Sequence, residues 1–124
     1  MACLSRYQTL ARDLNISIVP GTICEVHPAG PSAPGRESDA DEEIRNMCYF
    51  IAAGTGEILG SYQKKNLWHP ERHVLTSGGG HSPHVAFDTP LKKQDGSPVR
   101  AGLLICWDLA FPEAFRQLVA PPSS

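Results

Sequence analysis

The feature that most constrains the fold is an apolar run that ends in a cysteine, GLLICW at residues 102–107. An uninterrupted apolar run of this length is typical of a buried strand. Phe111-Pro112-Glu113 then opens an amphipathic stretch, and Pro112 suits the first turn of a helix. The pattern predicts a strand that stops at Cys106 and turns into a helix. Such a turn exposes the sulfur close to a helix N-terminus, where negative charge is favoured.

The remaining patterns alternate between helix and strand. Apolar residues at helical spacing predict an amphipathic helix over residues 2–14. The GTGE turn at 54–57 joins two apolar runs and predicts a β-hairpin. A second helix is expected from Pro112. Runs rich in β-branched and apolar residues predict strands at 16–19, 22–26, 47–52, 58–62, 84–88 and 99–105. Together these elements predict an α/β or α+β arrangement within one domain, residues 1–124.

Residues 28–45 differ in composition from the rest of the chain. They are rich in Pro and Gly and then in Asp and Glu, with few residues to bury. The composition predicts a solvated, flexible loop, and a functional lid is the alternative interpretation.

The net charge of −2 gives no electrostatic basis for binding nucleic acid or an anionic membrane. No apolar stretch is long enough to span a bilayer, and the first residues lack the pattern of a signal peptide. The four cysteines are scattered without a CxxC pair. We expect a cytoplasmic protein with free thiols, three of them packed as small hydrophobic residues.

Cys106 and Lys64 are the first two candidates for chemistry. A thiolate at Cys106 could attack a carbonyl or nitrile carbon, whereas the alternative is an inert cysteine that ends a core strand. Lys64 follows the strand at 58–62 and could stabilise an oxyanion or lower the pKa of a thiol. The alternative for Lys64 is a solvated surface lysine like Lys65.

Glu71 is the third candidate, seven residues after Lys64. A buried carboxylate there could hold the lysine in place and keep it charged. The alternatives are an exposed ion pair with Arg72 or a carboxylate that favours the start of a helix after Pro70.

Two separated motifs, YQKKNLW at 62–68 with Glu71 and GLLICWDLAFPEAFR at 102–116, resemble the nitrilase superfamily of carbon–nitrogen hydrolases. Residues 11–25 are similar to that family's helix–strand passage, and residues 49–62 are similar to its hairpin. The resemblance implies a partial α-β-β-α sandwich. It also implies a small amide or nitrile substrate, no metal or organic cofactor, and assembly into a homo-oligomer.

The resemblance also implies roles for individual residues. Cys106 matches the nucleophile, which forms a thioester, and Lys64 matches the lysine that stabilises the tetrahedral intermediate. Glu71 resembles the additional glutamate near that lysine, and the backbone N–H of Trp107 would complete the oxyanion hole. The Cys-Trp-Asp sequence is more similar to the amidase and carbamoylase branches than to the nitrile-cleaving branch.

The chain departs from the family pattern in two respects. No residue matches the general-base glutamate, for which Glu25 is a poor substitute, and no segment after Val119 matches the family's C-terminal half. We therefore expect the central part of a longer hydrolase. A non-catalytic remnant or interaction module is the second interpretation. A metal-binding module is the third, although the spacing of its candidate ligands fits no compact zinc pattern: His69, His73, His81, His84 and Cys106.

Overall fold

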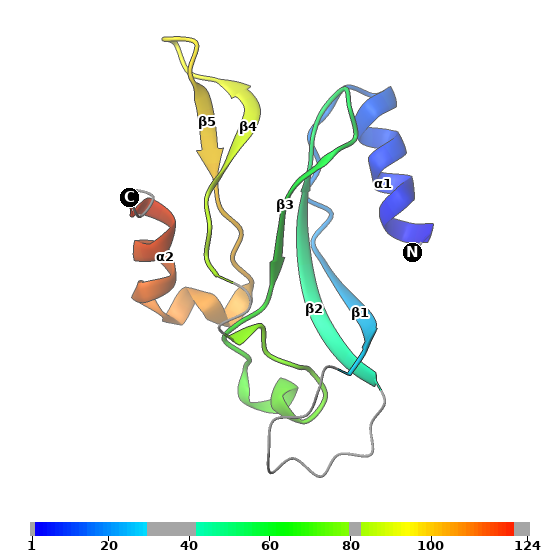
Figure 1. Ribbon diagram of the computed structural model, residues 1–124, viewed down its shortest axis with the longest axis vertical. Helices are drawn as coiled ribbons and strands as arrows, with labels where there is room; N and C mark the ends of the chain where they lie inside the picture. The colour runs from blue at the N-terminus through cyan, green and yellow to red at the C-terminus, as the bar shows by residue number, and fades with distance from the viewer. Residues whose placement is uncertain (1, 30–41, 80–82, 121–124) are drawn as a thin grey trace.

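The computed structural model describes residues 2–29, 42–79 and 83–120, and the structural statements below refer to these residues. The molecule has four layers, in the order helix, sheet, hairpin, helix (Figure 1). This arrangement confirms the expected α/β class and the partial α-β-β-α sandwich. The elements are α1 (Ala2–Asp13), β1 (Thr22–Pro28), β2 (Glu42–Ile51), β3 (Ile58–Gln63), η1 (His69–His73), β4 (Phe87–Lys92), β5 (Pro98–Ala101), η3 (Cys106–Ala110) and α2 (Pro112–Val119).

The first sheet is antiparallel, with β2 between β1 and β3. One face of β2 packs against α1, where buried side chains from both elements form a cluster: Leu4, Ala11, Tyr49 and Ile51. Leu4 and Ala11 are seven positions apart, so they lie on one face of the helix. Asn15 then adopts a left-handed φ of 51°, as expected for a residue that follows a helix.

The opposite face of β2 points toward the second hairpin, because successive side chains of a strand alternate between faces. Cys48 packs there with Tyr62 and Ile105. Phe50 meets Phe87 of β4 with ring centroids 5.5 Å apart. The central strand is therefore covered on both faces, and its second face carries the segment that ends at Cys106.

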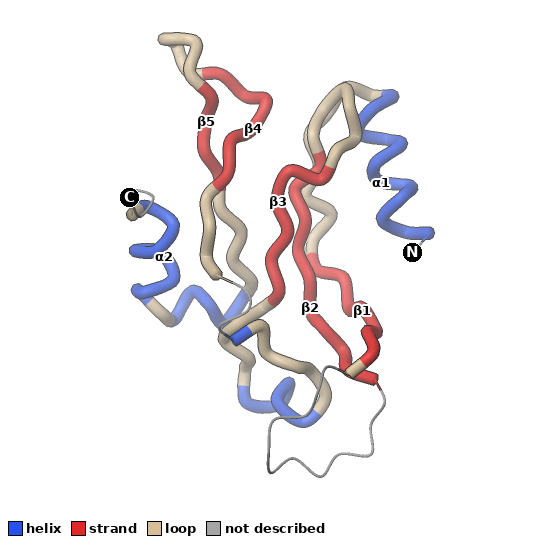
Figure 2. The backbone as a smooth tube through the Cα atoms, in the orientation of Figure 1, coloured by secondary structure: helices blue, strands red, loops and turns tan. Residues whose placement is uncertain are grey.

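Several strand boundaries differ from the sequence prediction. Of residues 16–19, only Ile18 forms a bridge, to Ile51, because Pro20 and Gly21 follow and interrupt the pairing. The strand expected at 84–88 is shifted to β4, which begins at Phe87 and continues to Lys92. The strand expected at 99–105 is confined to β5, and residues 102–105 form no ladder (Figure 2).

Both ends of the expected loop at 28–45 belong to strands. Pro28 ends β1, and residues 42–45 belong to β2, where they pair with residues 25–28. Acidic residues such as Glu43 suggested a loop, but the Glu43 side chain forms an ion pair with Arg45 on the strand. Residues 30–41 lie outside the described part of the chain.

The expectation that three cysteines are packed in the interior is wrong. Cys48 is buried, whereas Cys3 and Cys24 are exposed and all four thiols are free. Cys3 lies in the first turn of α1 and Cys24 on edge strand β1, positions that periodicity alone does not distinguish from buried ones. None of the described helices is both long and apolar enough to cross a membrane.

Candidate active site

Cys106 lies at a sharp turn of the backbone. Ile105 is extended, with φ −125° and ψ 119°, and Cys106 has a φ of 45°. A positive φ is uncommon for a residue other than glycine and is found where the surroundings impose it. The turn leads into η3 and then into α2, so a short 3₁₀ segment separates the cysteine from the predicted helix. The side chain of Cys106 is exposed, so the alternative of a buried core cysteine is wrong.

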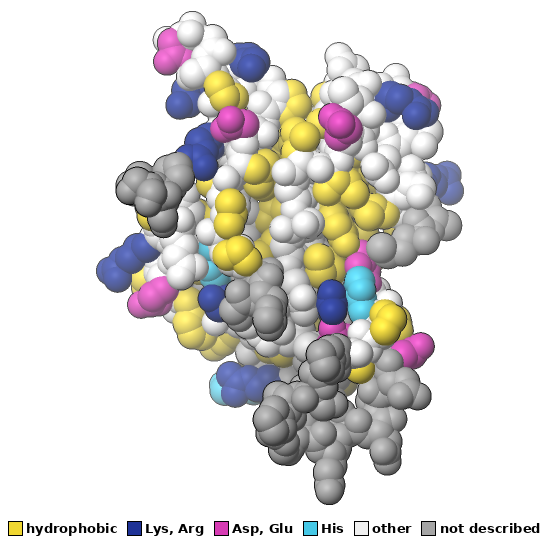
Figure 3. Space-filling model, in the orientation of Figure 1, with side chains coloured by type: hydrophobic (Ala, Val, Ile, Leu, Met, Phe, Trp, Pro, Cys, Tyr) yellow, Lys and Arg dark blue, Asp and Glu magenta, His cyan; other side chains and the backbone are white. Residues whose placement is uncertain are grey.

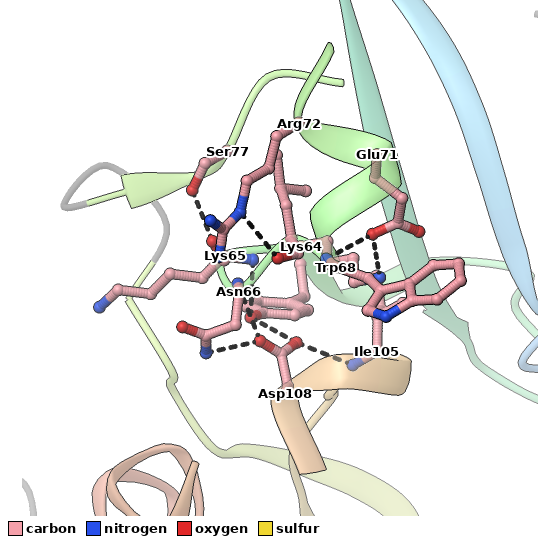
Figure 4. Close-up of polar contacts among 11 residues, drawn as sticks. Lys64, Lys65, Asn66, Trp68, Glu71, Arg72, Ser77, Ile105 and Asp108 are labelled. Atoms are coloured by element: carbon pink, nitrogen blue, oxygen red, sulfur yellow. Dashed lines mark hydrogen bonds and ion pairs between the residues drawn. The ribbon is translucent and has the colours of Figure 1, made fainter. Parts of the chain in front are cut away.

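Lys64 is completely buried, with 0% of its surface exposed, so its interpretation as a surface lysine is wrong. Its backbone N–H donates to the carbonyl of Asn46 at 2.9 Å, which extends the β2–β3 pairing one residue beyond β3. Its Nζ donates to Oε2 of Glu71 at 2.6 Å (Figure 4). A buried ammonium needs such a partner, because its desolvation would otherwise be very costly.

Glu71 lies on η1 and is held by two donors. Besides Lys64, the backbone N–H of Trp68 donates to its Oε2 at 2.9 Å. Partial burial opposes ionisation of the carboxyl group, but these hydrogen bonds and the charge of Lys64 outweigh it and lower the pKa of Glu71. Glu71 therefore stays ionised beside the Lys64 side chain. The expected alternative, an ion pair with Arg72, does not form, and Arg72 donates to the carbonyl of Leu67 instead.

Asp108 connects the lysine segment to the cysteine segment (Figure 4). Its carboxylate is fully buried and accepts four hydrogen bonds. Oδ1 accepts from the backbone N–H and from Nδ2 of Asn66, at 3.1 and 2.8 Å. Oδ2 accepts from the Tyr62 hydroxyl at 2.8 Å and from the Ile105 N–H at 3.0 Å. Asp108 was not among the residues predicted to carry a role, although a carboxylate directly after an apolar run was a usable signal, since buried charges need partners.

Trp107 links the two short 3₁₀ helices. Its ring lies 6.5 Å from that of His69 on η1 and 6.5 Å from that of Phe111, measured between centroids. The residue after the cysteine thus touches the segment that carries Glu71. The four residues singled out from the sequence come from two segments that the fold places side by side: Lys64, Glu71, Cys106 and Trp107.

Glu25 faces away from this site. Its carboxylate accepts from the Tyr49 hydroxyl at 2.5 Å and pairs with His27 at 2.9 Å. Tyr49 belongs to the buried cluster beneath α1. Tyr62 points to the opposite face of the sheet, and Lys64, two positions further along, lies on the same face as Tyr62. Glu25 is therefore unsuited to act as a base for Cys106.

The histidines that the structure describes do not gather into a metal site. Within residues 2–29, 42–79 and 83–120, no group of three His, Cys, Asp or Glu side chains could hold a metal ion. His84 is buried against Tyr62, and His69 packs on Trp107. His81, another candidate ligand, lies outside the described residues.

A family model described as carbon–nitrogen hydrolase matches residues 1–122 of the chain. The chain belongs to the carbon–nitrogen hydrolase family. It is 34% identical over 83 residues to a probable nitrilase of Schizosaccharomyces pombe, a match that covers 67% of this chain and 26% of that protein. It is 27% identical over 113 residues to the deaminated glutathione amidase of Rattus norvegicus, a match that covers 89% of this chain and 31% of that protein. The chain thus spans about a quarter to a third of the length of these curated relatives. The resemblance seen in the two sequence motifs thus extends over nearly the whole chain.

Proposed function

We propose that the protein hydrolyses a non-peptide carbon–nitrogen bond of a small amide, carbamoyl compound or nitrile, with Cys106 as the nucleophile. The observation that carries the proposal is the junction at Asp108. One buried carboxylate fixes the residue before Cys106 and the residue two positions after Lys64. The backbone segments that carry Cys106 and Lys64 are thereby hydrogen-bonded to the same side chain.

For an amide, the proposed reaction has two stages. The sulfur of Cys106 attacks the carbonyl carbon and forms a C–S bond, and the oxygen becomes negatively charged. The ammonium of Lys64 and the backbone N–H of Trp107 stabilise that charge. The C–N bond then breaks, and the leaving nitrogen takes the proton that the thiol gave up, so that ammonia or an amine departs. Water attacks the remaining thioester, the C–S bond breaks, and the acid is released. Glu71 acts through Lys64, which it keeps charged and in place.

Among the possible substrates we favour amides over nitriles. The Cys-Trp-Asp sequence at 106–108 is more similar to the amidase and carbamoylase branches, and one relative is named an amidase. We also propose, from the family resemblance, a cytoplasmic protein that assembles with copies of itself and needs no cofactor.

The test is to incubate the protein with a panel of small aliphatic amides and the matched nitriles. Hydrolysis is measured by the release of ammonia. In the wild-type chain, we expect mass spectrometry of the intact protein to detect the acyl adduct of the thioester. We expect Cys106→Ala to abolish both this adduct and turnover. Cys24→Ala is the matched control, because Cys24 is also an exposed free thiol, and it should retain full activity. Turnover that survives Cys106→Ala would refute the assignment.

A non-catalytic member of the family is the second candidate function. It is favoured by the orientation of Glu25, which leaves Cys106 without that carboxylate as a base. Alkylation of Cys106 across pH, beside a Lys64→Ala variant, separates the two candidates. An active site predicts that Cys106 reacts at lower pH than the other exposed thiols and that Lys64→Ala removes this advantage. Equal labelling of the exposed thiols supports the non-catalytic candidate.

A further inference from the structure

We propose that Tyr62 and His84 are positioning residues that set the backbone at Cys106 through Asp108, and that they couple this turn to helix α2. The catalytic consequence rests on the proposed function, whereas the coupling itself does not. The sequence suggested no positioning role for either residue: Tyr62 was only the first residue of a motif, and His84 was only a candidate metal ligand. Both lie in a continuous line of hydrogen bonds that ends one residue before the cysteine.

The first link joins Asp108 to Ile105. Ile105 is buried beside Cys48 and Tyr62, and its N–H donates to Oδ2 of Asp108. Within the described part of the chain, no salt bridge is formed by Asp108. A buried carboxylate without a cation depends on its hydrogen bonds. Removing one donor to Asp108 should therefore weaken the hydrogen bond that fixes Ile105. The left-handed backbone conformation of Cys106, the next residue, would then be less well defined.

The second link fixes the direction of the hydrogen bonds at Tyr62. A hydroxyl has one proton to donate, and Tyr62 donates it to Asp108. Its oxygen accepts from the N–H of Lys65 at 3.1 Å. It must also act as acceptor toward Nε2 of His84, at 2.9 Å, so that nitrogen carries a proton. Burial and the contact with Asp108 raise the pKa of Tyr62, which keeps the hydroxyl protonated.

The third link reaches α2. The Nδ1 atom of His84 lies 2.6 Å from Oε1 of Gln117. With the proton on Nε2, Nδ1 is an acceptor, so the side-chain amide of Gln117 must be turned to present its NH₂ group as the donor. His84 is buried in the segment before β4, whereas Gln117 is on the exposed side of α2. The line of contacts therefore crosses from α2 to the end of β3 and then to η3. Within residues 2–29, 42–79 and 83–120, neither His84 nor Gln117 is hydrogen-bonded to Cys106, so their effect on the thiol must pass through Tyr62 and Asp108.

The experiment is timed alkylation of the full chain with iodoacetamide at one pH, with each thiol quantified by mass spectrometry. Cys3 and Cys24 are exposed references, and buried Cys48 reports loss of the fold. Tyr62→Phe keeps the ring but removes the donor to Asp108. We expect the labelling rate of Cys106, relative to the two references, to fall about tenfold, as for a misplaced reacting group. Cys48 should remain protected.

Matched histidine variants test the outer link. His84→Leu cannot donate to Tyr62 and should reproduce the effect of Tyr62→Phe, whereas His84→Gln can donate and should stay near the wild-type rate. His73→Leu, an exposed histidine on η1, should change nothing. Unchanged Cys106 labelling in both Tyr62→Phe and His84→Leu overturns the proposal. Parallel labelling of Cys48 also overturns it, because the residues would then only support the fold.

The two proposals fail separately. If the variants slow Cys106 labelling while the wild-type chain hydrolyses no amide or nitrile, the positioning role stands and the proposed function fails. If an amide is hydrolysed, His84→Leu should lower kcat with little change in KM, because His84 does not touch substrate. If the enzyme is active and His84→Leu leaves kcat unchanged, the positioning role is refuted and the proposed function stands.

Discussion

At the scale of single residues, the site depends on two charges taken out of water. Lys64 is buried and is neutralised by Glu71 from η1. Asp108 is buried and is satisfied by four donors that come from three separate positions along the chain. Each group is tolerated only while its partners remain, so single substitutions at these residues should have large effects.

The lowered pKa of Glu71 predicts a pH dependence of stability. A carboxyl group whose pKa is lower in the folded state contributes stability that is complete above its unfolded pKa, about 4.3. That contribution is lost as the pH falls through the lower, folded value. We expect the free energy of unfolding, measured with urea, to decrease across this acidic window. In Glu71→Gln the decrease should be smaller, and an identical pH profile would contradict the prediction.

Asp108→Asn is predicted to destabilise the fold. The amide has nearly the same shape, but its NH₂ group would face donors from Asn66 or from Tyr62 and Ile105. Opposed buried donors cost about 1–3 kcal/mol. Urea unfolding should show this loss, whereas Asp88→Asn is the control, because the exposed Asp88–Arg100 pair at 3.7 Å contributes roughly 0–1 kcal/mol. Equal effects of the two variants would contradict the role of burial.

At the scale of elements, the position of the second hairpin depends on one close contact. Phe87 of β4 lies against Phe50 and above Gly60 of β3. A Cβ atom built at Gly60 would lie 2.3 Å from the Phe87 ring. Glycine is therefore required where the ring approaches the strand. The hairpin leads directly into residues 102–105, so this contact also helps to place Cys106 (Figure 1).

Gly60→Ala should push β4 away from β3 and destabilise the fold by about 1–3 kcal/mol, the usual cost of overpacking. Thermal or urea unfolding measures the loss. The control is the same change in a Phe87→Ala background, where the ring is absent and the added methyl group should cost much less. Equal costs in the two backgrounds would show that the contact does not limit the approach of the hairpin.

At the scale of the whole molecule, the four layers leave much apolar surface uncovered. Hydrophobic side chains gather over the sheet and the hairpin in the face shown in Figure 3. On α2, Phe115 and Val119 are one turn apart and are 42% and 82% exposed. Apolar surface of this kind favours association.

We expect the 124-residue polypeptide to bind an apolar dye such as ANS and to elute as a species larger than a monomer. Polar substitution of the α2 face, Phe115→Gln with Val119→Gln, should lower both signals. Thr9→Gln, on the exposed surface of α1, is the control and should leave them unchanged. A monomer that binds no dye would contradict the prediction.

The sequence by itself determined the elements that depend on local pattern. Helical periodicity predicted α1, the GTGE turn predicted the β2–β3 hairpin, and an apolar run before a proline predicted a turn at Cys106. These features depend on neighbours a few residues away, which is why periodicity and turn chemistry suffice. The motifs also identified the family, because both lie in the chain in the expected order.

Only the tertiary structure decided which charged groups are buried and what they contact. Lys64 and Lys65 are adjacent and chemically alike, yet the register of β3 on β2 buries the first. Asp108 finds its partners 42 and 46 residues away, at Asn66 and Tyr62. No local pattern encodes such distances along the chain, since they depend on how the hairpin packs on the sheet. Sequence thus located the candidate nucleophile, and packing decided what holds it in place.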